Sequence, residues 1–508
     1  MKCLHVSCRS CTVLLDPDGL FEARREAKLS LNGKAYGTEK RSVATLFGLW
    51  PDTDYVLTAQ AEGESPREIC FHTAKETCTL NVRSFGAVGD GVHDDTAAIQ
   101  AAILCCPEDG RVLIPDGQYR TGPLFLKSHL TLEIRKNAVL LLKTDRSIFP
   151  ILPGVTRTTD EKDEYLLGSW EGNPLDCFAA AINGIGVEDV RLIGEGVVDG
   201  CAQESDWWIK PKEKRGAYRG RLLFLERCKN ITVSGLTFRN SPSWNLHPCF
   251  SEDLNFYNVK IQAPADSPNT DGFDPESCKN IRMYGTEFSV GDDCIAIKSG
   301  KIYLGMKYHT PCENIEIAWC AMLEGHGGVT VGSEMSGGVK NVRVHHCLMR
   351  GNDRGLRIKT RRGRGKYAVV DDIRFEHVTM QDVKAPLVIN SMYYCDPDGK
   401  TAYVQSREKQ PVDDTTPTVG SIAFENVTAD GCRACVGYVL GLPEKPVRRL
   451  TLKNSTFAFA NNAQGMVPAM ADGVEMCTRR GLIVRNVDML DVENVQMIGI
   501  DGREIDRQ

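Results

Sequence analysis

A short pattern of alternating polar and aliphatic residues recurs along most of the chain. In each copy a polar residue precedes an aliphatic one, and a second aliphatic or aromatic residue follows two positions later. The copies begin at Asn230, Asn280, Asn314, Asn341, Asp372 and Ser421. Alternation is typical of a β-strand, and its return after 27 residues from Asn314 to Asn341, then after 31 residues, is typical of stacked coils. The pattern predicts an all-β solenoid, a parallel β-helix, whose asparagines hydrogen-bond between coils at one corner.

The first 76 residues do not follow this pattern. Their short apolar runs alternate with turns such as Asp16-Pro17-Asp18-Gly19, which predicts a small β-sandwich domain. Residues 46–56, in which a tyrosine follows a leucine-x-proline turn, resemble the later part of a fibronectin type III domain. We therefore expect a sandwich over residues 1–76, a short linker, and a solenoid domain over residues 79–508.

Near the start of the solenoid the pattern becomes helical. Asp95 and Thr96 are residue types that begin helices, and the alanines and isoleucines from Ala97 to Ile103 favour a short helix. Such a helix can cap the open end of a solenoid.

Three polar segments interrupt the repeat and predict long loops. They cover residues 156–174, 201–221 and 395–416. Long loops of a repeat fold often gather on one face and border the binding site. Trp207 and Trp208, in the second segment, either stack on a bound ring or anchor the loop by packing.

Composition and charge exclude several classes of function. The net charge of -6 does not indicate a nucleic-acid binder, and the chain has no run of 18 apolar residues that would indicate a membrane span. Arg9 interrupts the first apolar run, so we expect no signal peptide, and the 20 cysteines then predict reduced thiols in the cytoplasm. The pairs Cys8/Cys11 and Cys432/Cys435 lie far apart in the sequence, so no joint zinc site is expected. The oligomeric state is not indicated.

Four polar clusters stand out against the repeat. They are Asn269-Thr270-Asp271, Gly291-Asp292-Asp293, Gly325-His326-Gly327-Gly328 and Arg357-Ile358-Lys359. Because their intervals correspond to one or two coils, a solenoid can stack them on one face.

The aspartates of these clusters suit acid–base chemistry. Asp292 and Asp293 are neighbours, and Gly291 permits a turn that lets both side chains face one cleft. Crowded carboxyls cannot all ionise at neutral pH, so one keeps a proton beside ionised partners, as glycoside hydrolysis requires. A solvated acidic turn or a calcium site would use the same residue types.

The remaining clusters add a histidine and two cations. His326 lies among glycines and can orient a neighbouring carboxylate, although a histidine in a tight turn would look the same. Arg357 and Lys359 share one face of a strand while Ile358 points to the core, so the two cations can clamp an anionic group. The basic run at residues 361–366 is interpreted as a solvated loop or a polyanion-binding patch.

Four strings carry a resemblance to a known family: NTDGFDP, GDDCIAIKSG, GHGGVTVGSEMSGGV and RGLRIKTRRGRG. In this order and spacing they resemble glycoside hydrolase family 28, the polygalacturonase family. The likeness runs from about Val82 to beyond Tyr394. It implies a right-handed parallel β-helix of the pectin lyase type, and an inverting hydrolase that uses no metal and no cofactor.

The resemblance implies catalytic roles for four residues. Asp292 corresponds to the general acid, Asp271 and Asp293 to the pair that activates water, and His326 to the histidine beside them. For an inverting hydrolase we expect the acid and base carboxyls to lie about 6.5–9.5 Å apart, which leaves room for the water.

The resemblance also implies substrate-binding residues. Arg357 and Lys359 correspond to the pair that binds a galacturonate carboxylate next to the scissile bond, and Asn269 is placed with them. A tyrosine of the cleft corresponds to Tyr393 or Tyr394, of which we prefer Tyr394 because it directly precedes a cysteine.

We therefore expect inverting hydrolysis of α-1,4-galacturonosyl linkages in a galacturonate-containing oligo- or polysaccharide. We expect an exo mode, because RGLRIKTRRGRG resembles bacterial exo-acting members and because the N-terminal domain and the long loops can close the cleft into a pocket. A rhamnogalacturonan or xylogalacturonan hydrolase of the same family and a pectate lyase-type β-elimination are the alternatives.

Overall fold

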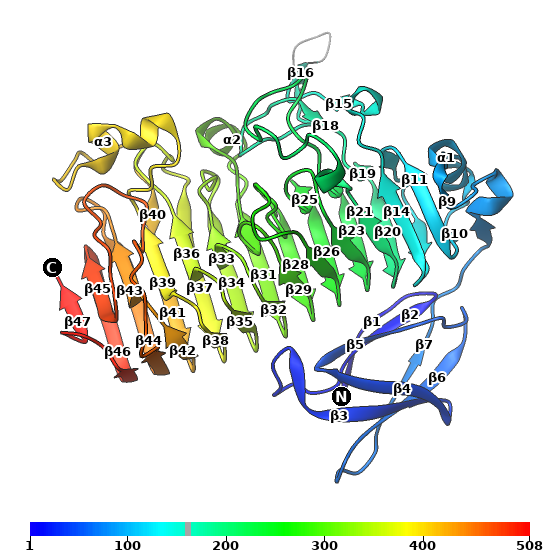
Figure 1. The fold of residues 1–508 in the computed structure, drawn as a ribbon, viewed down its shortest axis with the longest axis horizontal. Helices are drawn as coiled ribbons and strands as arrows, with labels where there is room; N and C mark the ends of the chain where they lie inside the picture. The colour runs from blue at the N-terminus through cyan, green and yellow to red at the C-terminus, as the bar shows by residue number, and fades with distance from the viewer. Residues whose placement is uncertain (158–163) are drawn as a thin grey trace.

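A computed structural model describes residues 1–157 and 164–508 of the chain (Figure 1). A small antiparallel β domain is followed by a long right-handed parallel β-helix. The prediction of an all-β solenoid after a small β domain is confirmed. The likeness of the small domain to fibronectin type III stays a prediction.

Two antiparallel sheets form the N-terminal domain, with strand orders β1-β2-β5 and β4-β3-β6-β7. Val13, Leu46 and Leu57 are fully buried in a core of their own. The strands span Lys2–Val6 (β1), Ser10–Leu14 (β2), Glu22–Leu31 (β3), Lys34–Arg41 (β4), Val43–Phe47 (β5), Asp54–Ala61 (β6) and Arg67–His72 (β7).

The β-helix has three faces, and two of them belong to one 25-stranded sheet. Each strand pairs in parallel with the same strand of the next coil, so that Ile281 lies beside Ile315, and Ile315 beside Val342. Aliphatic side chains therefore stack inside the solenoid. The strands span Thr79–Asn81 (β8), Asp90–Asp94 (β9), Gly110–Ile114 (β10), Gly117–Thr121 (β11), Leu130–Ile134 (β13), Ala138–Leu142 (β14), Glu188–Gly194 (β20), Val197–Asp199 (β21), Lys229–Ser234 (β23), Thr237–Arg239 (β24), Glu252–Tyr257 (β26), Lys260–Gln262 (β27), Lys279–Tyr284 (β28), Glu287–Ser289 (β29), Cys312–Ala318 (β31), Ala321–Met322 (β32), Val339–His345 (β34), Leu348–Arg350 (β35), Val369–Glu376 (β37), Thr379–Gln381 (β38), Thr418–Val419 (β40), Ser421–Glu425 (β41), Thr428–Cys432 (β42), Val447–Phe459 (β44) and Val487–Ile498 (β46).

The third face consists of two parallel sheets that single bridges join at Phe273, which pairs with Leu246 on one side and Ile295 on the other. Their strands span Leu124–Phe125 (β12), Ile182–Ile185 (β19), Leu223–Glu226 (β22), Leu246–Cys249 (β25), Ile295–Ile297 (β30), Gly327–Val331 (β33), Arg354–Lys359 (β36), Ala385–Asn390 (β39), Cys435–Leu440 (β43), Arg480–Arg485 (β45) and Ile505–Arg507 (β47).

Helices and short strands lie in the connections and at one end. Helix α1 buries Ile99, Ala102 and Ile103 against the first coils, which confirms the predicted helix. The segments span Val82–Phe85 (η1), Thr96–Cys105 (α1), Arg146–Ile148 (η2), Ile151–Leu152 (β15), Thr156–Arg157 (β16), Glu164–Tyr165 (β17), Cys177–Phe178 (β18), Ala202–Glu204 (η3), Ile302–Tyr308 (α2), Pro397–Lys400 (η4) and Ala402–Gln405 (α3).

A row of exposed asparagines, here called the asparagine corner, crosses the coils at Asn280, Asn314 and Asn341. Their φ angles are 59°, 58° and 54°, a left-handed conformation that asparagine tolerates. The Asn341 amide donates to Asn314 Oδ1 at 2.8 Å, and the Asn314 amide donates to Asn280 Oδ1 at 3.1 Å. The predicted structural role of these asparagines is confirmed.

The N-terminal domain packs on the side of the solenoid away from the long loops (Figure 1). Asn258 of the β-helix binds the domain through two hydrogen bonds. The Asn258 amide donates to the Val43 carbonyl at 2.8 Å, and Thr45 Oγ1 donates to Asn258 Oδ1 at 2.7 Å. Tyr284 and Trp319 share a buried apolar cluster with Val43.

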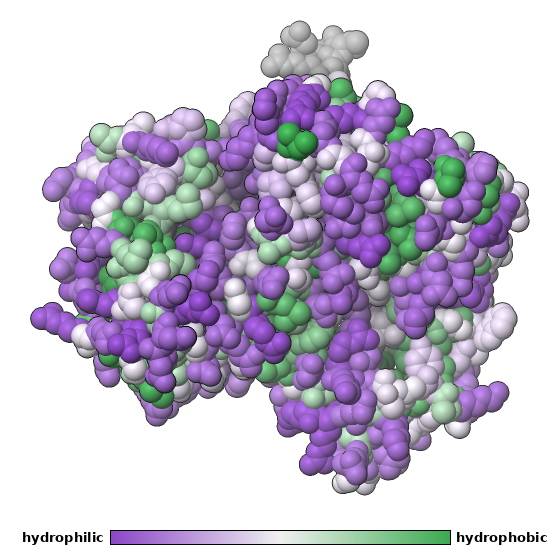
Figure 2. Space-filling view, viewed as in Figure 1, coloured by the Kyte–Doolittle hydropathy of each residue, from purple (hydrophilic) through white to green (hydrophobic). Residues whose placement is uncertain are grey.

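Hydrophilic side chains cover most of the face seen in Figure 2, and the hydrophobic ones form separate small patches. The apolar side chains of the repeat thus lie mainly inside the solenoid. Within the described part of the chain, no helix combines the length and apolar character needed to cross a membrane.

Candidate active site

The four polar clusters come together on the third face, where they line a cleft of about 370 Å³. Every site residue predicted from the sequence borders it, while their roles stay predictions. The lining residues are Glu171, Lys212, Trp244, Asn269, Asp271, Asp292, Asp293, Lys298, His326, Ser333, Glu334, Arg357, Lys359, Tyr393, Tyr394, Cys395, Asp396, Lys400 and Met470.

Two glycines make room for the three aspartates. A Cβ on Gly291 would lie 2.3 Å from the Ser267 carbonyl oxygen, and a Cβ on Gly327 would lie 2.7 Å from Asp293 Oδ1. With these side chains absent, Asp292 and Asp293 enter β30 from a tight turn, as the sequence predicted for Gly291.

The spacing of the carboxylates differs from the expectation. One carboxyl oxygen from each of Asp271, Asp292 and Asp293 lies within 4.8 Å of those from the other two. They come from the same edge of adjacent coils, whose strands are only about 4.8 Å apart, so the solenoid brings them closer than an opposite-face arrangement requires. The expected separation of about 6.5–9.5 Å is wrong, and spacing alone does not determine the stereochemical outcome.

Asp293 is held as an anion by two cations. Lys359 Nζ donates to its Oδ2 at 2.9 Å, and Arg357 Nη1 donates to its Oδ1 at 3.4 Å. Burial alone would raise the pKa of Asp293. The charges of Lys359 and Arg357 lower it by more than burial raises it, so the pKa of Asp293 lies below its usual range.

Asp271 has the opposite electrostatic environment. Its side chain is buried and its Oδ1 has no hydrogen-bond partner. Burial and the nearby charge of Asp292 raise the pKa of Asp271 well above its usual range. A carboxyl with a raised pKa, Asp271, thus lies beside a carboxylate with a lowered pKa, Asp293, as expected for crowded carboxyls.

His326 orients Asp292. Its Nδ1 lies 3.2 Å from Asp292 Oδ1, and its backbone N–H donates to the Asp292 carbonyl at 3.0 Å. The hydrogen bond to Asp292 raises the pKa of His326 above its ordinary value. Asp292 is the most accessible of the three aspartates, with 24% of its side chain exposed, so it is the one best placed to reach a substrate.

The cationic pair adjoins a tyrosine. The Tyr393 ring centroid lies 5.8 Å from the Arg357 guanidinium and 5.6 Å from Lys359 Nζ. Tyr394 also lines the cleft, but its ring neighbours Lys400. The structure thus places Tyr393 beside the cation pair, contrary to the preference for Tyr394.

Trp244 borders the cleft and belongs to a stack of aromatic rings, here called the aromatic wall. Trp170 stacks on Tyr218 at 5.0 Å and on Trp244 at 6.1 Å between ring centroids, from three separate loops. Arg219 joins this wall to the site, because it donates to Asn269 Oδ1 at 2.6 Å. The predicted residue Asn269 is therefore held by the wall as well as facing the cleft.

Several cleft residues escaped the sequence analysis. Glu171 and Met470 come from loops, and a repeat pattern does not indicate where loops fold. Lys298 had a usable signal, because it follows β30 at the position at which Lys359 ends β36.

Trp207 and Trp208 do not line the cleft. Trp207 is fully buried, with its ring edge-on to Phe149 and Phe178. The Trp208 indole N–H donates to the Ser241 carbonyl at 3.1 Å. The structure therefore supports the packing role and contradicts the sugar-stacking role.

The basic run at residues 361–366 is neither a solvated loop nor a polyanion patch. Arg361, Arg362 and Arg364 are buried. Arg362 makes two hydrogen bonds to Glu444, at 2.7 and 2.9 Å, and Arg361 pairs with Asp398 at 2.9 Å. These arginines hold the loop of η4 and α3 beside the cleft, and alternation alone could not reveal their acidic partners.

The N-terminal domain does not close the cleft. The described lining residues all lie between Glu171 and Met470, and the domain docks on the opposite side of the solenoid. The expectation that it shapes the pocket is therefore wrong, whereas loops from all three predicted segments do border the cleft.

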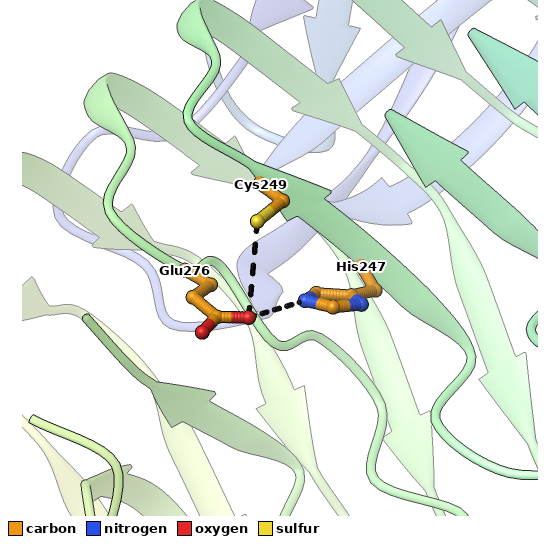
Figure 3. Close-up of side chains that lie close together, drawn as sticks. All are labelled: His247, Cys249 and Glu276. Carbon is orange, nitrogen blue, oxygen red and sulfur yellow. Dashed lines mark hydrogen bonds and ion pairs between the residues drawn. The ribbon is translucent and has the colours of Figure 1, made fainter. Parts of the chain in front are cut away.

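Among the described residues, three groups could hold a metal ion: the three aspartates, a group at His129, and a buried group of His247, Cys249 and Glu276 (Figure 3). In the buried group, Glu276 Oε2 lies 3.0 Å from His247 Nε2 and 3.8 Å from Cys249 Sγ, and it accepts a hydrogen bond from Ser169 at 2.8 Å. Ser169, His247 and Cys249 all lie at this Glu276 oxygen, so the group has a structural role. It fixes the loop that carries Ser169 and Trp170 to the third face.

Comparison with known proteins identifies the family. The family model for glycosyl hydrolases family 28 matches residues 131–458, and one described as rhamnogalacturonase A/epimerase, pectate lyase-like, matches residues 79–133. A probable polygalacturonase from Vitis vinifera is 32% identical over 402 residues, which cover 77% of this chain and 76% of the relative.

Solved structures show the same fold. A hyperthermoactive exopolygalacturonase from Thermotoga maritima is 26% identical with a TM-score of 0.63, over 81% of this chain and 91% of that one. A family 28 exopolygalacturonase from Yersinia enterocolitica is 19% identical with a TM-score of 0.65, over 100% of this chain and 97% of that one, and shares the fold. Because the family model covers more than half of the chain, this protein belongs to glycosyl hydrolases family 28 and is a glycoside hydrolase.

Proposed function

We propose that this protein hydrolyses α-1,4-galacturonosyl linkages of polygalacturonate or its oligomers, in an exo mode and with inversion. The observation that carries the proposal is the contact of Arg357 and Lys359 with Asp293, because it places a carboxylate-binding cation pair directly beside the acid trio. The relatives named as polygalacturonases support the same substrate class.

In the proposed mechanism Asp292 donates a proton to the glycosidic oxygen. Its partial exposure and its contact with His326 place it at the cleft surface. Asp293, held ionised by its cations, deprotonates the attacking water, which Asp271 helps to position. The proton that Asp293 takes from the water replaces the one that Asp292 gives to the leaving oxygen, so the site recovers its proton after each turnover.

The exo mode is supported by the aromatic wall. The loop that carries Trp170 also contacts the segment that follows β30, where the Lys301 N–H donates to the Gly172 carbonyl at 2.8 Å. A Cβ on Gly172 would lie 2.7 Å from Glu334 Cβ, so the loop is in tight contact there. A chain end is therefore accommodated more readily than the middle of a polymer.

Specific contacts in the cleft argue against two alternative activities. A calcium-dependent elimination needs carboxylates free to bind the ion, whereas Asp293 is already paired with two fixed cations. A rhamnogalacturonan or xylogalacturonan hydrolase shares the acid trio, but the cation pair favours a galacturonate beside the cut. A cytoplasmic location stays a prediction that fractionation of the native host would test.

The test is product analysis on trigalacturonate and on long polygalacturonate, with a chelator present. We expect monomer or dimer from the first time points, no unsaturated product absorbing in the ultraviolet, and an inverted anomer in proton NMR. A spread of intermediate oligomers would contradict the exo mode, and a retained anomer would contradict inversion. Loss of activity with chelator together with unsaturated ends would establish elimination instead.

A further inference from the structure

Lys298 is a buried cation of the cleft to which the mechanism above gives no role. It is 3% exposed and borders the cleft. Its Nζ donates to Glu334 Oε2 at 3.2 Å, lies 3.4 Å from Asp274 Oδ1, and lies 4.6 Å from the Trp244 ring centroid. A lysine ammonium has three N–H donors, so two carboxylate neighbours leave one donor for a further partner.

The register of the third face relates Lys298 to Lys359. Ile297 pairs with Val331, and Val331 pairs with Ile358, so the next residues in each strand, Lys298, Gly332 and Lys359, occupy one row across three coils. Two coil spacings separate the lysines, about 10 Å along the solenoid axis. Gly332 between them carries no side chain to block the row.

The acid trio lies on the Lys298 side of this row. Asp292 and Asp293 belong to the coil of Lys298, and Asp271 belongs to the coil before it, whereas Arg357 and Lys359 lie two coils further on. If a substrate follows the solenoid axis, the sugar held by Arg357 and Lys359 is on one side of the scissile bond. The neighbouring sugar then lies next to Lys298 and Trp244, against the aromatic wall.

The charge balance at Lys298 leaves its cation available. Burial raises the pKa of Asp274 to about 8, so this carboxyl is mainly protonated at neutral pH. Glu334 then remains the ionised direct partner of Lys298, and it also interacts with the charge of Lys301.

We propose that Lys298 binds the carboxylate of the sugar on the other side of the scissile bond from the one held by Arg357 and Lys359. Lys298 is then a specificity-determining residue that selects galacturonate over a neutral sugar at the walled end of the cleft, with Trp244 beside it. This inference rests on the proposed function and deepens it.

The test uses disaccharides in which each position is varied separately. The wild-type enzyme, K298M, K298R and R357M are compared on digalacturonate and on the two analogues in which one galacturonate is replaced by galactose. Inhibition by free galacturonate and by galactose is measured in parallel, so slow turnover of a dimer does not prevent a result. Thermal unfolding of each variant establishes that it folds.

K298M is expected to lose the preference for galacturonate at one sugar position by about ten-fold or more, because a charge-assisted hydrogen bond is lost. K298R should retain part of this preference. R357M should lose the preference at the other position and keep the first, which makes it the matched control.

A purely structural role for Lys298 predicts a different result. K298M would then lower kcat/KM by the same factor on all dimers and leave both preferences unchanged, which would overturn the inference. If K298M does not fold, the inhibition measurements on K298R decide, because an unchanged galacturonate-to-galactose ratio would overturn it as well. A wild-type enzyme inactive on polygalacturonate and on every dimer would instead remove the proposed function.

Discussion

Two rows of polar side chains cross the coils of the same solenoid, and they differ in how their polarity is satisfied. In the asparagine corner the Asn341 and Asn314 amides each donate to the neighbouring asparagine, and the Asn280 amide donates to Asp253 Oδ1, so every amide of the row has a partner on the adjacent coil. In the cleft the row contains buried carboxylates, and Asp271 Oδ1 has no hydrogen-bond partner. Neutral amides both donate and accept and can stack indefinitely, whereas like charges cannot, so stacked carboxylates are forced to different pKa values.

The comparison teaches how a repeat fold produces a reactive site. The repetition that stabilises the solenoid places three carboxylates within 4.8 Å of one another. Two cations from a later coil stabilise one of them as an anion, and burial raises the pKa of another. The cost of these buried charges is offset by the rest of the stacked core.

The largest expected difference between the two rows is in activity, and replacing the Asp292 carboxyl by an amide tests it. We expect D292N to lower kcat/KM by about 10³-fold, because a positioned general acid contributes about 10²–10⁴-fold. Its unfolding midpoint should stay close to wild type, because Asp292 is partly exposed. Kinetics on polygalacturonate and thermal unfolding check this, and an active D292N would remove the assigned acid.

The buried ion pair of Arg362 and Glu444 is a third arrangement, in which a buried charge is fully paired. R362M leaves Glu444 unpaired in the interior, and we expect a loss of about 3–5 kcal/mol in the free energy of unfolding. Denaturant unfolding measures this loss. K366M is the matched control, because Lys366 pairs with Asp414 at the surface, and it should unfold as wild type does. Equal effects in the two variants would show that burial of the pair does not matter.

The pH dependence of stability probes the unsatisfied carboxyl. Because the pKa of Asp271 is raised in the folded state, its contribution to stability is fully present below the unfolded pKa of about 3.8 and is lost as pH rises through the folded pKa. D271N has no such loss, so its stability relative to wild type should increase by about 1.4 kcal/mol for each pH unit between the unfolded and the folded pKa of Asp271. Unfolding at a series of pH values from 4 upward measures this, and a constant difference would contradict the raised pKa.

The smallest effect is expected in the asparagine corner. N314G keeps the left-handed backbone and removes the side-chain hydrogen bonds, so it should cost about 1 kcal/mol of stability, without pH dependence and with unchanged kcat/KM. N314A should cost about 1 kcal/mol more, because a Cβ is strained at this φ. Equal stability of N314G and wild type would show that the row is not stabilising.

Much of the fold was predictable because its signals are local. Alternation restarted at a regular interval indicates a β-helix, and α1 was indicated by its alanines and isoleucines. The nine predicted site residues meet in one cleft because coil spacing converts regular sequence intervals into proximity. Lys298 could have been found in the same way, from its row with Lys359.

The loops and the domain docking were not predictable in the same way. Their polar segment does not tell whether Trp207 and Trp208 face substrate or core. The packing of Trp207 against Phe149 and Phe178 and the hydrogen bond of Trp208 to Ser241 decide it. In the sequence the arginines at 361–364 resemble a surface patch. In the fold, Glu444 and Asp398 from distant loops form ion pairs with them. Nothing in the sequence of the N-terminal domain indicates that it docks on Asn258 of the β-helix.

The sequence by itself determined the solenoid, its asparagine corner and the identity of the reactive side chains, because each follows from short-range periodicity or from a local motif. Only the tertiary structure decided which carboxyl has the raised pKa, which tyrosine adjoins the cation pair, and which loops border the cleft. These properties depend on burial and on distances of a few ångströms between loops far apart in the chain, and both arise only when the coils and loops pack together.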